Sequence, residues 1–362
     1  SDALVDKLYT ASTESAFRSS GAGSHYATWQ TITTQFDRTG YFPMIPDYEK
    51  TGLFFFTRPK LNFMGSNLRQ DRVMATLDTI DPKSFPFSIR CYLDSNFANW
   101  DLMSNIVQKS PLVNPESPFI VPLTNQLMTM SGFPDFEVQR ETLAKGFYGE
   151  DQTIARGSDM NNGTYDFTLT FSNFNGGYID AFFLYWIRYI ALVARGDMFA
   201  YQEDIYARRL CYTCSIYRFV LDSSKTFITR WCKATGCFPY NIPIGRIFDV
   251  TAKEAYITAA QEITIPFIAN HVEYNDPIIF KDFNSRVDWW AGAQYPFKQS
   301  SDGTVISNMG RIKSVLRTGA DNFRGIPYLD TWSGSTELIF FAEPHDLVDP
   351  VESVIAHVSP TM

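Results

Sequence analysis

The chain of 362 residues is short of charge, since Asp, Glu, Lys and Arg make up only 19% of it, against roughly 25% in an ordinary soluble domain. Aromatic residues by contrast reach 16%, with 31 Phe and 19 Tyr. Interface cores are depleted in charge and enriched in aromatic residues, so this composition favours a subunit that covers part of its surface in an assembly. The alternative is a core larger than usual.

Basic residues are outnumbered, and the net charge is −8 with an isoelectric point of about 5.1. A general nucleic-acid-binding surface would be basic, so tight DNA or RNA binding is not expected. An acidic surface that lets DNA pass without sticking is compatible with this balance, although charge alone does not argue for it.

Targeting and membrane signals are missing as well. Residues 1–7 lack a basic region followed by an apolar run, so they do not read as a secretory signal. No stretch reaches the roughly 20 uninterrupted apolar residues of a membrane span, and no membrane insertion is predicted. The five cysteines are an odd number in a long chain, which disfavours a secreted disulfide framework.

Catalytic motifs are equally scarce. There is no G-x-S-x-G, Walker or dinucleotide fingerprint, and the four histidines form no H-E-x-x-H pair. No catalytic and no cofactor-binding residue is therefore assigned. Acidic residues beside aromatic ones would suit a sugar cleft with two carboxylates, which keeps a carbohydrate-cleaving enzyme as an alternative. These residues are Asp94, Asp101, Asp282 and Asp288, near Trp100, Trp289 and Trp290.

The one metal candidate is a set of two cysteine pairs. Cys211 and Cys214 are followed by Cys232 and Cys237, a spacing that approaches that of a zinc site. The second pair is too wide for the usual knuckle. Four reduced, mostly buried thiols are the favoured interpretation, and zinc is the weak alternative.

Residues 164–195 are the most regular part of the chain. Over 164–171 polar and apolar residues alternate without a break, which is the period of a half-buried strand. Residues 172–177 supply turn residues and two glycines. Over 178–195 apolar residues recur at helical spacing, and Gly196 follows as the expected C-cap. The sequence thus predicts a strand, a turn and a long helix at the centre of the fold.

The predicted helix is apolar around much of its circumference. Asp180 and Arg188 interrupt it, so it is too polar for a membrane span. A helix of this kind is buried on several sides or is covered by a partner subunit. The candidate subunit-interface residues on it are Phe182, Phe183, Trp186 and Ile190.

Three regions are predicted along the chain. Residues 1–50 form an N-terminal arm and linker, residues 51–345 a β-rich domain with insertions, and residues 346–362 a peripheral tail. Residues 80–135 are rich in proline and irregular, but apolar residues continue through them, so they do not form a free linker.

The segment 52–63 contains three consecutive Phe followed by Thr-Arg-Pro. This pattern indicates a strand that is buried on both faces and ended by proline. Arg58 is expected at the strand end, paired with a carboxylate. A functional charge is the alternative for Arg58, which joins the candidate subunit-interface residues.

Further strands are predicted over 87–93, 137–143, 214–221, 226–232, 262–268 and 337–341, and a short helix over 124–131. The strands 214–221 and 226–232 flank residues 222–225 and are expected to form a hairpin. The proline within 262–268 indicates an edge strand or a bulge.

The polar loop at 146–159 is punctuated by glycine and links the strand 137–143 to the central strand. Together these segments are expected to form a long hairpin with a mobile tip.

The central unit carries a family resemblance. Residues 165–171 alternate and end in Phe, and residues 179–190 follow with Phe-Phe and Trp on a helix. This unit resembles the strand–helix core of tail-tube proteins of contractile-tailed bacteriophages. Residues 53–62 and 235–239, with Pro243 beyond, are similar to segments of virion structural proteins of large phages.

The resemblance implies an α+β fold, mainly an antiparallel β-barrel or sandwich of tail-tube type with a flanking long helix and irregular insertions. It implies a hexameric ring in which strands of all subunits join into one lumen wall, removing free sheet edges. Residues 1–50, 80–135 and 285–335 exceed the minimal pattern. This surplus suits a baseplate-proximal tube initiator as well as the repeating tube protein.

The function implied is that of a non-enzymatic virion subunit without a cofactor, assembled in the host cytoplasm and located in the phage tail. Its expected partners are further copies of itself and tail-tube, baseplate or tape-measure proteins, with DNA passing through the lumen without specific binding. The hairpin at 137–172 is the predicted inter-ring contact, and ring assembly is predicted to depend on the stripe of Phe182 and Trp186. The alternatives are a neck, sheath or capsid-associated protein, or a carbohydrate-cleaving tail enzyme.

Overall fold

The computed structural model describes residues 51–79, 81–95, 113, 117–135, 137–159, 163–173, 176–221, 228–248, 262–290, 310–312, 326–330 and 336–342. The predicted arm at 1–50 and the predicted tail at 346–362 lie outside the described residues. In chain order the elements are β1 (Thr51–Phe56), α3 (Gly65–Leu68), the 3-10 helix η1 (Met74–Leu77), α4 (Phe85–Leu93), α6 (Val121–Gln126), β2 (Leu127–Ser131), β3 (Glu137–Thr142), β4 (Thr153–Asp159), β5 (Tyr165–Ser172), α7 (Tyr178–Arg195), α8 (Gln202–Tyr206), β6 (Cys214–Leu221), β7 (Ile228–Pro239), α9 (Gly245–Phe248), β8 (Glu262–Ala269), β9 (His271–Tyr274), α11 (Ile278–Trp290), β10 (Gly310–Ile312), β11 (Ile326–Asp330) and β12 (Glu337–Ala342). Within this described part, none of the helices is long and apolar enough to cross a membrane.

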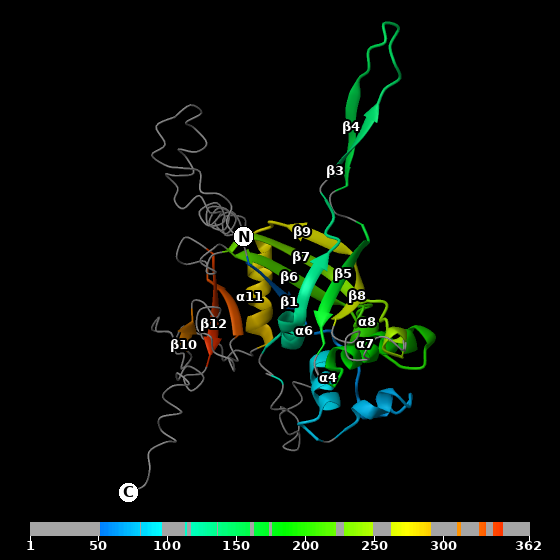
Figure 1. Ribbon diagram of the computed structural model, residues 1–362, viewed down its shortest axis with the longest axis vertical. Helices are drawn as coiled ribbons and strands as arrows, with labels where there is room; N and C mark the ends of the chain where they lie inside the picture. The colour runs from blue at the N-terminus through cyan, green and yellow to red at the C-terminus, as the bar shows by residue number, and fades with distance from the viewer. Residues whose placement is uncertain are drawn as a thin grey trace, which may run out of the picture.

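An antiparallel sheet in the order β1-β6-β7-β8-β5-β2 forms the body of the molecule, with β9 added to β7 (Figure 1). The central strand predicted from alternation is confirmed as β5. It pairs with β8 over its whole length, from Tyr165 opposite Ala269 to Ser172 opposite Glu262. The predicted hairpin of β6 and β7 is also confirmed.

The sheet bends at Gly236 in β7. This glycine has a φ of +67°, a left-handed conformation that is strained for residues with a Cβ. Beyond the bend Phe238 pairs with Ile268 of β8, and before it Thr235 pairs with His271 of β9. Bulges and bends of this kind let a strand pass from one layer to another. β7 thus joins the layer of β1, β6 and β9 to the layer of β2, β5 and β8.

A short segment links the two ends of the sheet. Residues 117–120 lie along β1, where the Ile120 N–H donates to the Phe56 carbonyl at 2.8 Å. The chain then enters α6, which leads directly into β2 at the opposite end of the sheet. The described strands therefore form a bent, partly wrapped sheet rather than the closed barrel that the resemblance offered, because a single bridge and a one-turn helix replace the closing ladder. The α+β class with mainly antiparallel strands is confirmed.

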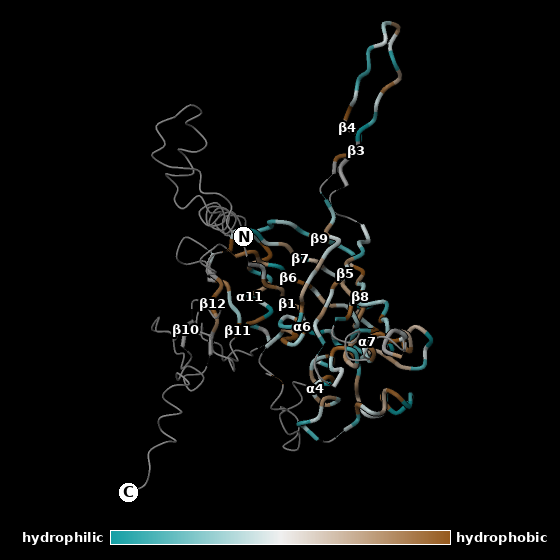
Figure 2. The backbone as a smooth tube through the Cα atoms, in the orientation of Figure 1, coloured by the Kyte–Doolittle hydropathy of each residue, from teal (hydrophilic) through white to brown (hydrophobic). Residues whose placement is uncertain are grey.

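Helix α7 packs against β5 and β8 and fills the main core. The ring of Phe183 lies 5.2 Å from that of Phe171 and 5.8 Å from that of Phe267, measured between centroids. The predicted C-cap is confirmed, since Gly196 has a φ of +81° and its N–H donates to the Val193 carbonyl at 3.1 Å. Figure 2 shows hydrophobic residues, in brown, recurring along the strands and α7.

A second apolar cluster lies on the other face of β1 and β6, under α11. Phe283 of α11 packs on Phe55, Phe119 and Phe219 with centroid distances of 5.3, 4.9 and 5.2 Å. Phe55 belongs to this cluster whereas Phe56 belongs to the main core. The prediction of a first strand buried on both faces is thus confirmed. The small sheet β10-β12-β11 joins α11 through β11.

In two segments the predicted type of element is wrong. The strand expected over 87–93 lies in helix α4, because the Ser84 hydroxyl accepts from the Phe87 N–H at 3.4 Å and Pro86 lies in the first turn. The helix expected over 124–131 is divided between α6 and β2, since the second half pairs with β5. The cap decides the first segment, and pairing with a distant strand decides the second, against the type of element that the residue pattern predicts.

Candidate assembly surface

The most prominent surface feature is a two-stranded hairpin that projects from the body (Figure 1). β3 pairs with β4 from Glu137 opposite Asp159 to Thr142 opposite Thr153, as a sheet of its own. The Leu143 N–H continues the ladder by donating to the Gln152 carbonyl at 2.8 Å. A hairpin was predicted here, but with the central strand as the second arm. The second arm is instead β4, which forms from residues predicted as loop, while β5 pairs with β2 and β8.

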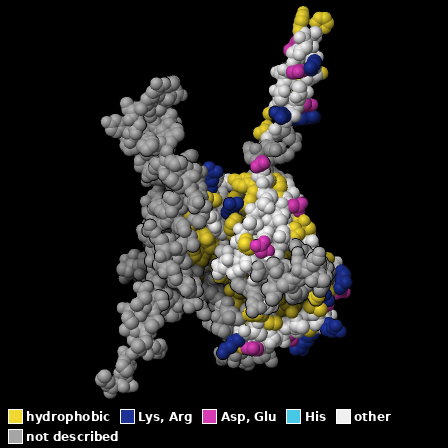
Figure 3. Space-filling model, viewed as in Figure 1, with side chains coloured by type: hydrophobic (Ala, Val, Ile, Leu, Met, Phe, Trp, Pro, Cys, Tyr) yellow, Lys and Arg dark blue, Asp and Glu magenta, His cyan; other side chains and the backbone are white. Residues whose placement is uncertain are grey.

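The hairpin tip presents two aromatic rings to solvent. Phe147 is 96% exposed and Tyr148 is 89% exposed, and their rings lie edge to face with centroids 5.3 Å apart. The turn is closed by the Gly146 N–H, which donates to the Glu150 carbonyl at 3.1 Å, and Gly149 has a φ of +79°. Figure 3 shows hydrophobic side chains, in yellow, at the end of the hairpin. Aromatic residues are enriched in protein–protein interfaces, so two adjacent exposed rings indicate a contact site.

Besides the backbone ladder, the described side chains of the hairpin shaft form ion pairs at the surface. Arg156 pairs with Glu141 at 3.0 Å and Lys145 with Asp151 at 3.7 Å, between side chains that are all at least 42% exposed. Exposed pairs of this kind contribute little free energy, and a two-stranded hairpin alone is marginally stable in water. A hairpin of this length with both edges open therefore suits a segment that a neighbouring molecule covers.

The base of the hairpin is fixed firmly to the body. The ring of Phe133 lies 4.9 Å from that of Phe167 in β5, and the Arg218 guanidinium lies 5.4 Å from the Phe133 centroid. The Tyr274 hydroxyl donates to the Pro134 carbonyl at 2.7 Å. Burial raises the pKa of Tyr274 to about 12, which keeps this donor protonated. The hairpin thus leaves the sheet from an anchored position.

The stripe on α7 lies inside the subunit. Phe182, Phe183 and Trp186 have no exposed area in the single chain, whereas Ile190 is partly buried. The Trp186 indole N–H donates to the Tyr212 carbonyl at 2.9 Å. Three of the four side chains are therefore already covered by the chain's own core, and the part of the stripe in ring assembly stays a prediction.

Arg58 is buried at the junction of α4 and α11, with 8% exposure. Its guanidinium lies 5.0 Å from the ring centroids of both Tyr92 and Trp290, which places it between two aromatic faces. Burial lowers the pKa of Arg58 to about 10. Arg58 thus contacts both α4 and α11 within the subunit. Its pairing with a carboxylate and its interface role stay predictions.

The cysteines are free and buried. Cys214 and Cys237 are opposite each other on β6 and β7, but Cys232 is opposite Arg218. Cys232 therefore lies four ladder positions, or about 13 Å, from the pair. Among the described residues no group of three or more His, Cys, Asp or Glu side chains is placed to hold a metal. The four thiols of the zinc alternative therefore do not converge on one point where a metal could bind.

Two of the acidic residues considered for a sugar cleft have interior contacts. Asp94 accepts from the Phe63 N–H at 3.1 Å and from the Tyr201 hydroxyl at 2.8 Å. Asp282 of α11 pairs with Lys233 at 3.0 Å and accepts from the Tyr217 hydroxyl. Burial opposes ionisation of Asp282, yet these partners hold its pKa below the ordinary value. A general acid needs a raised pKa, so Asp282 does not suit that role; Asp101 lies outside the described residues.

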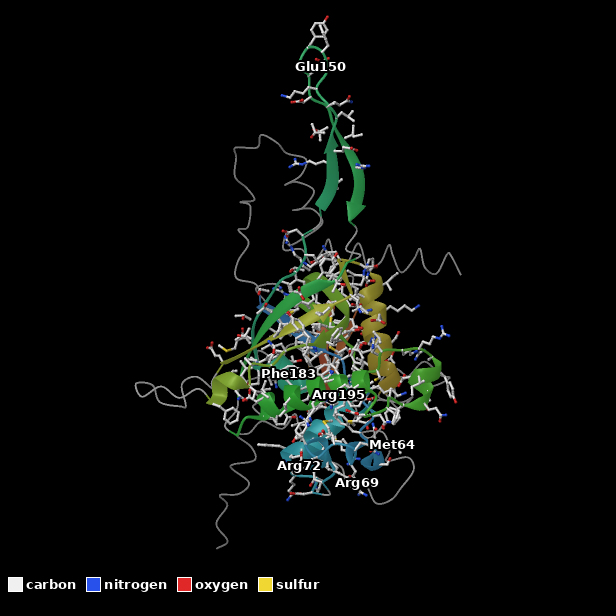
Figure 4. All side chains as sticks on the ribbon, turned by 90° about the vertical axis from the view of Figure 1, so that its right-hand side faces the viewer. Met64, Arg69, Arg72, Glu150, Phe183 and Arg195 are labelled. Atoms are coloured by element: carbon white, nitrogen blue, oxygen red, sulfur yellow. The ribbon has the colours of Figure 1, made fainter. Side chains whose placement is uncertain are left out.

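A lobe at the end of the body opposite the hairpin packs on α7. Asp71 accepts two hydrogen bonds from Arg188 at 2.9 and 2.8 Å, and the Asn67 amide donates to the Phe199 carbonyl at 2.9 Å. These contacts place residues 64–72 beside the C-terminal half of α7. Figure 4 shows this end of the molecule. We define the lobe patch as five of its exposed residues, Met64, Arg69, Arg72, Arg195 and Phe199.

The hairpin was predicted from the sequence as the inter-ring contact, but the two aromatic residues of its tip and the lobe patch were not singled out. A signal for the tip existed, since Phe147 and Tyr148 are adjacent aromatic residues between two glycines in a polar loop. The patch carried no such signal, because its members come from segments more than 100 residues apart.

Among the described strands, β2 pairs only with β5 and β9 only with β7, and these edges together with a projecting aromatic hairpin define an α+β protein suited to assembly. The chain belongs to the family described as "Putative phage tail tube protein", whose model matches residues 3–351. The resemblance drawn from the central strand and helix is thereby confirmed.

Comparison with other proteins adds three structural neighbours. No curated protein sequence matches the chain. The anti-feeding prophage cap, a tube terminating cap, is 14% identical with a TM-score of 0.25, covering 44% of this chain and 84% of that one. The sheath/tube terminator of the extracellular contractile injection system PVC is 13% identical with a TM-score of 0.23, covering 41% and 84%. A chain of the PVC sheath-tube complex is 16% identical with a TM-score of 0.25, covering 43% and 82%. TM-scores of this size are too low to define the fold or the function of the present chain.

Proposed function

We propose that the chain is a non-enzymatic structural subunit of a hexameric phage tail tube or of its baseplate-proximal initiating ring. Its family membership supports the tube assignment. The observation that carries the assembly role is the anchored hairpin, whose exposed aromatic tip and open edges suit a contact between rings. Within the predicted range 137–172, the inter-ring contact is assigned to β3, β4 and the turn between them.

Lateral contacts within a ring are assigned to the sheet edges. Among the described strands, β2 lies at one end of the main sheet and β1 at the other, and β9 pairs only with β7. An open edge is a template for a strand of another chain. Strand pairing between subunits would extend the sheet around a ring and form the lumen wall. Ile190, the partly buried member of the α7 stripe, remains a candidate for these contacts.

DNA would pass through this lumen without specific binding. The net charge of −8 is compatible with that part of the proposal, because general nucleic-acid binding needs a basic surface. The partners would be copies of the same chain together with other tail-tube, baseplate and tape-measure proteins. The protein would be assembled in the host cytoplasm and located in the tail of the virion.

Negative-stain imaging with light-scattering mass tests the proposal. We expect six-fold rings or tubes, with a ring mass six times that of the 41.3 kDa chain. The measurement is repeated with candidate baseplate proteins, since an initiating ring can depend on its partner. A monomer under both conditions would refute the assembly role, and release of sugar from surface polysaccharide would favour the enzyme alternative.

A further inference from the structure

The hairpin tip combines apolar rings with a negative charge. Residues 143–152 contain one lysine and two acidic residues. Lys145 pairs with Asp151, while Glu150 has no ion-pair partner among the described residues. The tip therefore presents Phe147, Tyr148 and one carboxylate together to a partner.

The lobe patch has the complementary chemistry. Met64 is 44% and Phe199 61% exposed, and the side chains of Arg69 and Arg195 are 75% and 67% exposed. In a chain of net charge −8, the segments 60–78 and 188–210 hold seven Lys or Arg and five Asp or Glu. Each of these five acidic residues already has an ion pair. Arg72, by contrast, has no acidic partner within the described part of the chain.

The two surfaces lie at opposite ends of the long axis. Figures 1 and 4 share a vertical axis, and both place the hairpin at one end and the lobe at the other, with Glu150 and Arg72 labelled in Figure 4. From residue 137 to residue 147 an extended strand reaches about 33 Å. The tip therefore points away from its own body, and the lobe patch it complements is within reach only on another copy.

We propose that the tip of the β3–β4 hairpin docks onto the lobe patch of a second copy of this chain. Phe147 and Tyr148 cover Met64 and Phe199, through aromatic and sulfur–aromatic contacts. Glu150 pairs with the guanidinium of Arg72. This contact joins different surfaces of two identical chains, so it is heterologous. Because the two surfaces lie at opposite ends of the long axis, the contact repeats along a stack. It deepens and rests on the tube function proposed above, by naming the receiving site of the inter-ring contact.

Disulfide crosslinking tests the contact in the full chain. The variant Tyr148→Cys with Met64→Cys is oxidised with oxidised glutathione, while the native thiols are all buried. Each copy offers one tip and one patch, so we expect a ladder of covalent dimers, trimers and longer species on a non-reducing gel. The control combines Tyr148→Cys with Ile278→Cys. Ile278 is 53% exposed and close in sequence to Tyr274 at the hairpin base, and this pair should give no ladder.

Charge reversal provides an independent readout. We expect Glu150→Arg to raise the concentration needed for stacking at least about tenfold, since it places like charges together at the contact. Arg72→Glu alone should do the same, and the double variant should recover most of the loss. Both positions are exposed, so these variants should keep the unfolding midpoint of the natural chain.

Images of the same samples distinguish failure of the docking site from failure of the tube function. If rings stack normally but the Tyr148→Cys/Met64→Cys variant gives no ladder and the reversals have no effect, the docking site is wrong while the tube function stands. If neither rings nor tubes form with partners present, the proposed function fails, and the docking inference fails with it.

Discussion

Replacing Trp186 by Phe should separate a core role of the α7 stripe from an interface role. The Trp186 side chain is fully buried, stacks on Phe183 at 6.3 Å and meets Phe267 edge to face at 6.1 Å. Its indole N–H donates to the Tyr212 carbonyl at 2.9 Å. The substitution keeps an aromatic ring but removes this donor and part of the ring volume.

The magnitude follows from two losses. A buried carbonyl left without its donor costs about 1–3 kcal/mol, and the cavity left by a smaller ring costs about 1 kcal/mol more. We therefore expect the free energy of unfolding to fall by about 2–4 kcal/mol. A domain of ordinary stability, about 5–15 kcal/mol, survives this loss. The variant should thus be folded and should still form rings below its own unfolding midpoint.

Urea unfolding followed by circular dichroism measures the stability, and imaging below the midpoint measures assembly. Trp231→Phe is the matched control, because Trp231 is 6% exposed in the other cluster and its indole N–H donates to the Asp276 carbonyl at 2.8 Å. It should lower stability to a similar degree. An unchanged midpoint for Trp186→Phe, together with lost rings, would refute the core reasoning and restore the interface prediction for this residue.

Three further outcomes follow from individual contacts. The hydrogen bonds from Arg188 hold the pKa of Asp71 at about 2, below its ordinary 3.8, so the stabilisation is present above pH 4 and is lost as the pH falls from 4 to 2. Asp71→Asn should cost about 1 kcal/mol at pH 7, after allowance for screening of the partly exposed Arg188, and its stability should match that of the natural chain at pH 2. Gly236→Ala should lower stability by about 1–2 kcal/mol in thermal unfolding, because φ there is +67°; no change would mean that the bend relaxes freely. Burial raises the pKa of Cys214 and Cys237 well above the ordinary value, so a thiol reagent at pH 8 should label them only after denaturation, and fast native labelling would contradict their burial.

The best sequence predictions concern segments with a strong period and matching ends. The alternation over 164–171 and the apolar spacing over 178–195 give β5 and α7 with nearly the right bounds, because a local period directly determines which side chains share a face. Gly196 ends the helix where expected, because its left-handed conformation is a local property.

The composition and the central pattern also led to the tube family, which the match over residues 3–351 confirms. They could not say which face of α7 meets the rest of the chain. The buried state of Trp186 depends on β8, which comes from a distant part of the sequence and places Phe267 against the indole ring.

The tertiary structure decided which strands form the predicted hairpin and which residues form the lobe patch. Residues 153–159 lack a strong strand period and become β4 because β3 supplies their hydrogen-bond partners. The lobe patch exists because the Asp71–Arg188 pair and the Asn67 amide hold two remote segments together. The sequence by itself determined the periodic elements and the family, since these depend on neighbouring residues. Strand partners, burial and surface patches needed the fold, since they depend on contacts between residues far apart in the chain.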